Sequence, residues 1–417
     1  MSAPATTARP VINERALLLM LAVVHFTHIM DFVIMMPLGA RLMRVFSISP
    51  AQFGHLVAAY GFAAALSGFL GGFVLDRFER KHALLTLYAG FSLATLACAL
   101  SPSYHWLLLA RFAAGAFGGV AGSVVTAMVG DVVPPERRGR AMGTVMSAFP
   151  LATVLGIPFG LWLADLYEWH APFFLLTGMS VVVFIAGLRL LPHVPSHLST
   201  ASPWTQMRAI LVHPIHQRCF MLSTMLVFAG GCVIPFMAPS MVANVGLSEA
   251  QLKYIYLFGG AATLVSTYVI GRCSDRFDKL HVLSWVSLLA MITVAILTNL
   301  PAVPLATALT MTTLFFVSMS GRFAPAMAMM TNAVEARYRG GFMSVNSALQ
   351  QASGSIANLA AGLFLSSDAA GHIRGYGRVG LMSLVCFFLT GVLAWRLRAV
   401  APHAARPGAS QPAPVAS

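Results

Sequence analysis

Charged residues are scarce in this sequence. Only 9% of its 417 residues are charged, whereas 58% are hydrophobic. A soluble domain carries about 25% charged residues, and one this poor in charge would expose large apolar patches to water. The scarcity therefore excludes an ordinary soluble protein and indicates a chain that uses lipid as its solvent.

Acidic residues are the rarer charged class. Thirteen Asp and Glu stand against 26 Lys and Arg, which gives a net charge of +13. In a soluble protein this excess would suggest nucleic-acid binding. Here the basic residues form short clusters between apolar runs, an arrangement that sets the orientation of a membrane protein. We therefore expect a lipid bilayer, and no nucleic acid, as a partner.

Several functional signatures are also missing. The five cysteines are scattered without a CxxC pair, so neither a disulfide framework nor a metal site is indicated. The sequence has no Walker A motif, which disfavours ATP-driven transport, and no catalytic constellation, which disfavours an enzyme. The first apolar run, from Ala16, has no small-residue cleavage site, so no cleavable signal peptide is evident. We expect no cofactor and no metal.

Long apolar runs dominate what is present. A transmembrane helix needs about 20 mostly apolar residues. Twelve runs qualify as spans: 16–40, 52–75, 82–100, 105–131, 140–165, 170–191, 218–244, 251–273, 280–299, 303–333, 341–366 and 376–397. We expect an N-terminal six-helix half at 1–191 and a C-terminal half at 218–397. Between them, 192–217 is rich in Pro, His and Ser and predicts a cytoplasmic linker, and the Ala/Pro-rich tail 398–417 is expected to be disordered.

Lys and Arg are distributed unevenly over the two sides of this topology. Most fall on the side that holds both termini, and Arg111 and Arg322 fall inside spans. The opposite side holds only Arg41, Arg44, Lys253, Arg374 and Arg378. The positive-inside rule then places both termini in the cytoplasm, and we expect a multi-pass protein of a bacterial inner membrane.

The two halves are related by an internal repeat. At a constant offset of 199, residues 47–84 and 246–283 share twelve of 38 positions. The shared stretch includes Asp-Arg-Phe followed by an acid and a base, which common apolar composition does not readily produce. The repeat predicts an all-α membrane protein with twelve transmembrane helices in two pseudo-symmetric six-helix bundles. Transporters of this design bind substrate between the halves, near the middle of the membrane.

The loop after the second span carries the strongest motif. Its sequence, Gly72-Phe-Val-Leu-Asp76-Arg77-Phe-Glu-Arg80-Lys81, resembles the cytoplasmic signature G-x-x-x-D-R-x-G-R-K of the major facilitator superfamily. A glutamate replaces the second glycine of that signature. The resemblance implies a secondary transporter of the major facilitator fold, and it extends over nearly the whole chain. Within the superfamily, the chain looks most similar to twelve-span bacterial drug and sugar efflux permeases.

Two further motifs support this resemblance. The stretch from Arg111 to Gly115 is similar to the family's fourth-helix motif, in which an intramembrane arginine is tied to proton coupling. Gly156-Ile-Pro158-Phe-Gly160 is similar to the exporter motif G-P-x-x-G-G, although one residue separates Gly from Pro and the final Gly pair is absent. That departure weakens the inference of antiport.

The charged loops suggest a conformational latch. Its predicted members are Gly72, Asp76, Arg77, Arg80, Lys81, Asp275 and Arg276. Carboxylate and guanidinium groups can form charge-assisted hydrogen bonds across the seam between the halves, and such bonds would hold one conformation. The alternative is ordinary positive-inside charge without a latch.

Small residues recur at helical spacing in the fourth and fifth spans. Gly115 and Gly119, and likewise Gly156 and Gly160, are four residues apart, a spacing that lets helices approach closely. Such smooth faces suit helices that slide, but they also suit tight static packing. Pro158 removes a backbone donor and predicts a kink in the fifth span.

Asp31 is the only acid deep inside a span. Counted along the helices at about 1.5 Å per residue, it lies within several ångström of the depth of Arg111. Burial opposes the charged carboxylate and Arg111 favours it, so we predict a proton-coupling site at this pair. His28 shares a helical face with Asp31 and could relay protons, or it could simply bond a neighbouring helix. The alternative for the pair is a permanent contact that only orients the helices.

Four residues are predicted to bind substrate. Arg322 lies near mid-membrane without an acid in the second half to pair with, which invites an anionic or polar group; it could instead cap backbone carbonyls or pair with Asp31. Met35 could line a plastic apolar pocket or fill a lipid-facing surface. Asn346 and Gln350, in the eleventh span, could reach substrate or bond other helices.

Together these features predict a monomeric secondary active transporter that works by alternating access on a small-molecule substrate. We expect a proton-coupled exporter, an antiporter of drugs, sugars or metabolites. One alternative is a proton-coupled importer of an organic anion or nutrient, which Arg322 supports. Another is a non-transporting membrane receptor or regulator, which would usually carry an appended soluble domain.

Overall fold

The computed structural model describes residues 14–74, 78–192 and 203–406. In these ranges the chain is almost entirely helical, and the only strands form a two-residue hairpin of β1 (Ser366–Ser367) and β2 (Ile373–Arg374). Ten helical segments are long and apolar enough to cross a membrane. The predicted spans 303–333 and 341–366 are helical too, but the first is interrupted at Arg322 and the second is rich in Ser, Asn and Gln.

Six spans make up the first half. Its elements are α1 (Glu14–Ile34), α2 (Gly39–Val45), α3 (Pro50–Val74), α4 (Arg80–Ala99), α5 (Tyr104–Val132), α6 (Pro135–Met146), α7 (Ala148–Leu151), the π-helix η2 (Ala152–Gly156), α8 (Ile157–Tyr167) and α9 (Ala171–Leu190). The fifth span runs from α6 to α8 and widens into η2 just before Pro158. Proline has no N–H for the carbonyl four residues earlier, which accounts for the irregular turn there.

The second half repeats this layout. Its elements are α10 (Pro203–Val212), α11 (Pro214–Gly231), α12 (Ile234–Ala243), the 3-10 helix η3 (Glu249–Gln251), α13 (Leu252–Arg276), α14 (Lys279–Leu297), α15 (Leu305–Gly321), α16 (Phe323–Ala333), the 3-10 helix η4 (Ala336–Tyr338), α17 (Arg339–Phe364), α18 (Tyr376–Val400) and α19 (Pro402–Ala405). The repeat is visible in side-chain contacts. Glu79 pairs with His82 at 2.6 Å, and their counterparts Asp278 and His281 lie 3.9 Å apart.

Two segments that the sequence marks as irregular contain helices. The predicted linker includes α10, whose Ile210 is buried and lies against Gly341 of α17. The first residues of the predicted disordered tail complete α18 and form α19, where Ala404 and Ala405 are fully buried. Lys279 Nζ also donates a hydrogen bond of 2.8 Å to the Arg406 carbonyl. Small apolar side chains that pack against α16 explain this order, which composition alone does not reveal.

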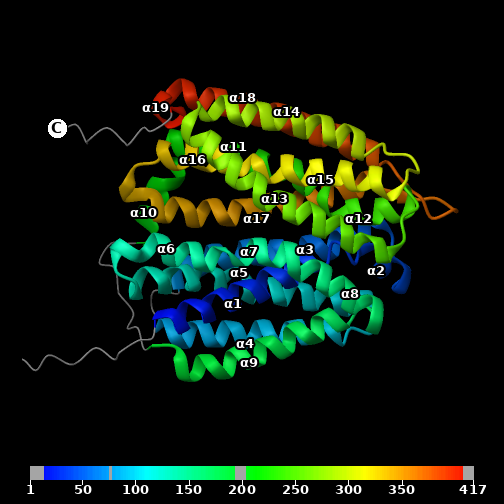
Figure 1. Cartoon of the computed structure of the whole chain (residues 1–417). Coiled ribbons are helices and arrows are strands. Elements are labelled where there is room, and N and C mark those ends of the chain that lie inside the picture. Colours follow the sequence, from blue (N-terminus) through cyan, green and yellow to red (C-terminus); the bar gives the residue numbers. More distant parts are fainter. Residues whose placement is uncertain (1–13, 75–77, 193–202, 407–417) are drawn as a thin grey trace, which may run out of the picture.

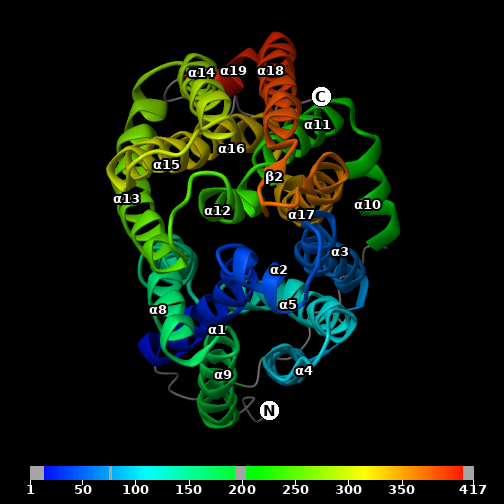
Figure 2. The same cartoon turned by 90° about the vertical axis from the view of Figure 1, so that its right-hand side faces the viewer.

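The helices form two bundles that lie side by side, α1–α9 in one and α10–α19 in the other (Figure 1). The start of α1 and the short helix α19 lie at the same end of the molecule, which we name the terminal end (Figure 1). The opposite end, which carries α2 and α12, is the distal end. Figure 2 looks onto the distal end, where α2 and α12 meet between the bundles.

The apolar core differs between the two ends. Toward the distal end, one core unites residues of both halves, among them Phe53 of α3 and Phe236 of α12. Toward the terminal end, each half has a separate core, built around α1, α4 and α5 in the first half and around α11, α16 and α18 in the second. Among the described residues, the buried apolar cores of the two halves are therefore merged at the distal end and separate at the terminal end.

Candidate functional site

A buried ion pair links the first and fourth spans. Arg111 Nη1 of α5 donates to Asp31 Oδ2 of α1 at 2.7 Å and to the Asp31 carbonyl at 3.1 Å. Both side chains are completely buried, and Thr95 of α4 donates to the other carboxylate oxygen at 3.3 Å. The structure thus brings together the two residues that the sequence placed at similar depth.

Tyr60 of α3 extends this pair into a chain of contacts. The Arg111 guanidinium lies 4.5 Å from the centre of the Tyr60 ring, a cation–π distance. The Tyr60 hydroxyl is 2.6 Å from Nδ1 of His28. The contacts therefore form one chain from His28 through Tyr60 and Arg111 to Asp31. The sequence interpretation included His28 but missed Tyr60, and the only signal for it was a polar-tipped ring in the middle of an apolar span.

Glycines of α5 make this arrangement sterically possible. At Gly115 a Cβ would overlap the Tyr60 backbone, so α5 and α3 touch there main chain to main chain. A Cβ at Gly118 would come within 2.6 Å of both His28 Nδ1 and the Tyr60 hydroxyl, and at Gly119 within 2.5 Å of Ala64 Cα. These glycines of the fourth span let α5 pack closely on α3 and on His28 of α1, beside the ion pair.

The exporter-like motif of the fifth span packs against the same helix. A Cβ at Gly156 would lie 2.7 Å from Met30 Sδ, and one at Gly160 would lie 2.9 Å from Ile34 Cδ1. Met30 is the neighbour of Asp31 in α1. The bend that precedes Pro158 therefore lies against the helix that carries the buried carboxylate.

Arg322 is the second buried arginine, and its surroundings differ. It lies at the break between α15 and α16 and is 1% exposed. Its Nη2 is 3.0 Å from Met319 Sδ, and its guanidinium carbon lies 4.2 Å from the centre of the Phe387 ring. Nε and Nη1 have no hydrogen-bond partner among the described residues, and no described acid pairs with Arg322. It therefore does not pair with Asp31.

The other predicted substrate residues lie apart from Arg322. Gln350 Nε2 donates to Ser223 Oγ of α11 at 2.8 Å, and Asn346 is buried with its carbonyl oxygen unpartnered among the described residues. Met35 is fully buried in the apolar core shared by the halves. It directly follows the end of α1, and in this conformation it packs in the core and lines no accessible surface.

Two of the predicted latch residues of the first half have contacts within that half. Arg80 Nε lies 3.0 Å from Asp131 of α5, and Lys81 Nζ donates to the Leu188 carbonyl of α9 at 2.9 Å. These contacts hold α4 against α5 and α9.

The remaining latch residues contribute less to the described structure. Gly72 lies near the end of α3, while Asp76 and Arg77 fall outside the described residues. Asp275 and Arg276, at the end of α13, are exposed. The latch across the seam thus stays a prediction.

Ion pairs between the halves occur at the distal end. Arg41 of α2 lies 2.8 Å from Glu249 of η3 and 3.0 Å from Asp165 of α8. Arg44 reaches the same Glu249 at 2.5 Å, and Lys253 of α13 lies 4.0 Å from Asp165. The sequence interpretation counted the three cations only toward topology. It missed that an acid of each half, Asp165 and Glu249, lies on the same side of the membrane as these cations.

Besides α2 and α12, two sets of helices pack across the seam between the halves. α3 packs on α17, and η2 with α8 packs on α13 (Figure 2). At Gly61 a Cβ would overlap Ser355 of α17, and at Gly260 it would lie 3.1 Å from Val154 of η2. Gly61 and Gly260 are counterparts at the offset of 199. The repeat therefore places the same close approach on both sides of the seam.

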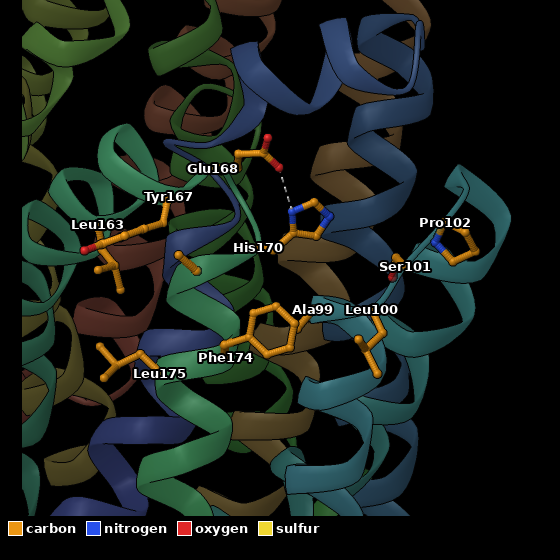
Figure 3. Close-up of a pocket in the computed structure, with 11 residues that line it drawn as sticks. Ala99, Leu100, Ser101, Pro102, Leu163, Tyr167, Glu168, His170, Phe174 and Leu175 are labelled. Atoms are coloured by element: carbon orange, nitrogen blue, oxygen red, sulfur yellow. Dashed lines mark ion pairs between the residues drawn. The ribbon is translucent and has the colours of Figure 1, made fainter.

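An open pocket of about 730 Å³ lies away from these features. It is formed at the distal end of the first half, between the α4–α5 turn and the α8–α9 turn (Figure 3). His170 and Glu168 face each other there at 3.6 Å. Burial lowers the pKa of His170, and the Glu168 carboxylate acts in the opposite direction. The pocket contains neither of the buried arginines and does not reach the seam.

Comparisons with known proteins agree with this architecture. The chain is 26% identical over 258 residues to an uncharacterized MFS-type transporter, YceJ, of Bacillus subtilis, a match that covers 61% of this chain and 65% of that protein. It is 23% identical over 229 residues to a probable sugar efflux transporter of Helicobacter pylori, which covers 55% and 58%. The chain thus matches less than two thirds of the length of these relatives.

Solved structures show the same fold. A bacterial homolog of the human lysosomal transporter Spinster, in an inward-facing conformation, superposes with a TM-score of 0.74 at 16% identity, over 95% of this chain and 99% of that one. A D-xylose–proton symporter gives a TM-score of 0.74 at 15% identity, over 90% and 97%. The sequence model of the Major Facilitator Superfamily matches residues 21–231 and 219–417. The chain therefore belongs to the major facilitator superfamily, and it is a multi-pass membrane protein with an all-α fold.

Proposed function

We propose that this transporter is a proton-coupled exporter that moves a drug, sugar or other metabolite out of a bacterial cell by alternating access. The observation that carries the proposal is the fully buried Asp31–Arg111 pair. An ionised side chain inside a membrane protein is costly unless it is paired, and such residues commonly belong to proton pathways. Protonation of Asp31 would remove its charge and release Arg111 from the pair.

The contacts around the pair supply a route for this change. Tyr60 bonds His28 and lies under Arg111. A shift of the Arg111 guanidinium would therefore move Tyr60 and alter its hydrogen bond to His28. Imidazole can accept and donate protons near neutral pH. In this scheme Asp31 carries the proton, Arg111 competes for the carboxylate, and His28 exchanges the proton with the water-filled side.

Alternating access is supported by the difference between the two ends. The shared apolar core and the ion pairs of Arg41, Glu249 and Asp165 close the distal end, while the halves keep separate cores at the terminal end. With both termini in the cytoplasm of an inner membrane, this is an inward-facing state of a monomer. The opposite state requires these distal pairs to part, and charges such as Arg77 and Arg276 would then latch the terminal end.

Export is favoured over import by two points. The relatives from Helicobacter pylori carry the name of probable sugar efflux transporters. The fifth-span motif with Gly156 and Gly160 packs directly against Met30, next to Asp31, so movement of this span and proton binding would be coupled. The competing function is proton-coupled import of an organic anion, which the unpaired Arg322 supports.

Inverted membrane vesicles with an imposed pH gradient test this proposal. Suitable probes are the fluorescent cation ethidium and radiolabelled glucose and gluconate. An exporter accumulates at least one probe when the vesicle interior is acidic, and Asp31→Asn abolishes accumulation while the protein still inserts. Glu136→Gln, which changes an exposed acid of α6, is the matched control and keeps wild-type transport. Normal transport by Asp31→Asn would refute the assignment of Asp31.

A further inference from the structure

The second half contains a buried arginine without an acid. Arg322 is 1% exposed, and two of its three nitrogens have no partner among the described residues. The third contacts a thioether sulfur, and the guanidinium lies over a phenyl ring. Sulfur is a weak acceptor compared with a carboxylate, so these contacts leave most of the donor capacity of Arg322 unused.

The internal repeat shows where an acid is missing. At the offset of 199, the counterpart of Asp31 is Gly230. Asp31 lies in the first span of its half and faces an arginine of the fourth span. Gly230 likewise lies in α11, the first span of the second half, and faces Arg322 at the α15–α16 break in the fourth. Arg322 is not itself the repeat counterpart of Arg111. The two halves correspond only in the helix position that faces the arginine, which is Asp31 in the first half and Gly230 in the second.

At Gly230 the face of α11 next to Arg322 carries no side chain. A Cβ built on Gly230 would lie 3.7 Å from Arg322 Nη2, 3.5 Å from Met319 Sδ and 3.4 Å from Ile234 Cδ1, all ordinary contact distances. In the first half, the same helix position carries the carboxylate that neutralises the charge of the arginine. In the second half, the absence of a side chain leaves Arg322 to be neutralised by something else.

We propose that the substrate supplies this missing charge, and that Gly230 and Arg322 form a subsite for the carboxylate of an organic monoanion. The inference rests on the proposed function only in that a small solute passes between the halves. Arg322 lies between the end of α15 at Gly321 and the start of α16 at Phe323, within the tenth span. One guanidinium balances one negative charge, so a carboxylate fits better than a doubly charged phosphate.

The subsite is closed in the present conformation. Met319 and Phe387, which are 5% and 1% exposed, cover the guanidinium. Methionine is unbranched and flexible, so the Met319 thioether can give way when a carboxylate takes its place. The incoming group would then receive hydrogen bonds from Nη2 and from the two nitrogens that have no partner.

Thermal unfolding of the purified full-length protein in detergent tests the subsite. The probes are benzoate and gluconate, their uncharged counterparts benzamide and glucose, and glucose 6-phosphate. In the wild type, at least one carboxylate raises Tm in a saturable manner and the uncharged counterparts do not. Gly230→Asp installs the internal carboxylate and raises the apparent Kd of that probe at least about tenfold, because charge-assisted hydrogen bonds are lost to competition.

Gly340→Asp is the matched control, because it adds the same carboxylate at an exposed position of α17 where a Cβ meets nothing within 4 Å, and it keeps the carboxylate response. The proposal is overturned if no carboxylate stabilises the wild type, if glucose 6-phosphate alone does so, or if the response survives Gly230→Asp. Binding in detergent needs no proton gradient. Failure of the subsite is therefore distinguishable from failure of proton coupling, which the Asp31→Asn vesicle assay reports.

Discussion

Replacement of Glu249 by Gln is expected to weaken the closure of the distal end. Glu249 is the point where two cations of the first half meet an acid of the second: Arg41 at 2.8 Å and Arg44 at 2.5 Å. The substitution keeps the shape of the side chain and removes its charge. Arg41 then keeps its ion pair with Asp165 and its hydrogen bond to the Ala164 carbonyl, both within its own half. The equilibrium should shift toward conformations in which the distal end is open.

The size of the shift follows from the exposure of the side chains. Glu249 is 16% and Arg41 20% exposed, whereas Arg44 is 67% exposed and contributes little. A hydrogen bond to a charged group is worth about 1.5–3 kcal/mol when buried, and an exposed pair about 0–1 kcal/mol. Because glutamine still accepts a hydrogen bond from Arg41, we take about 1.4 kcal/mol for the lost charge, which corresponds to about a tenfold change in the equilibrium.

Distance measurements between spin labels can detect this change. Leu100 and Ala302 are exposed in distal turns of opposite halves, and labels there separate when the distal end opens. Cys273, the one cysteine that is not buried, is replaced by Ser. Double electron–electron resonance should show the long-distance population growing about tenfold relative to the short one in Glu249→Gln.

The control is Glu168→Gln, which removes an exposed distal acid that pairs only with His170 of the same half. Its distance distribution should match that of the parent protein. If Glu249→Gln gives that same distribution, the ion pairs do not hold the distal end closed, and apolar packing alone accounts for the conformation.

Two further predictions concern the neighbourhood of the buried pair. Tyr60→Phe keeps the ring under Arg111 but removes the hydrogen bond to His28. Proton-driven uptake into inverted vesicles should fall several-fold, while the unfolding free energy changes by only about 1 kcal/mol. Unchanged uptake would exclude a relay through Tyr60. Gly115→Ala forces α5 away from α3 and should lower stability by about 1–3 kcal/mol, which is measured as a lower Tm. The control is Gly122→Ala, where a Cβ meets nothing within 4 Å, and its Tm should be unchanged or slightly raised.

The fold was predictable because its main constraint acts locally. In a membrane every backbone polar group must be satisfied within the protein, so a long apolar run forms a helix almost regardless of its neighbours. The pairing of Asp31 with Arg111 was predictable for a related reason. Charges are so rare inside the spans that two at one depth have few other partners.

The irregular segments were harder to predict. Composition marked the regions of α10 and α19 as linker and tail, but Ile210, Ala404 and Ala405 are buried against neighbouring helices. Whether a short Ala- or Pro-containing segment becomes ordered depends on the surface it meets. That surface is assembled from spans far away in the sequence.

What the sequence by itself determined is the number of spans, their division into two related halves, and the presence of charges at particular depths. Only the tertiary structure decided how each helix is rotated and which end of the seam is closed. Rotation placed Tyr60 between Arg111 and His28, buried Met35 in the shared core, and set Gly230 opposite Arg322. Length and hydropathy fix a residue's depth along a span, but its direction around the helix axis depends on how all twelve spans pack together.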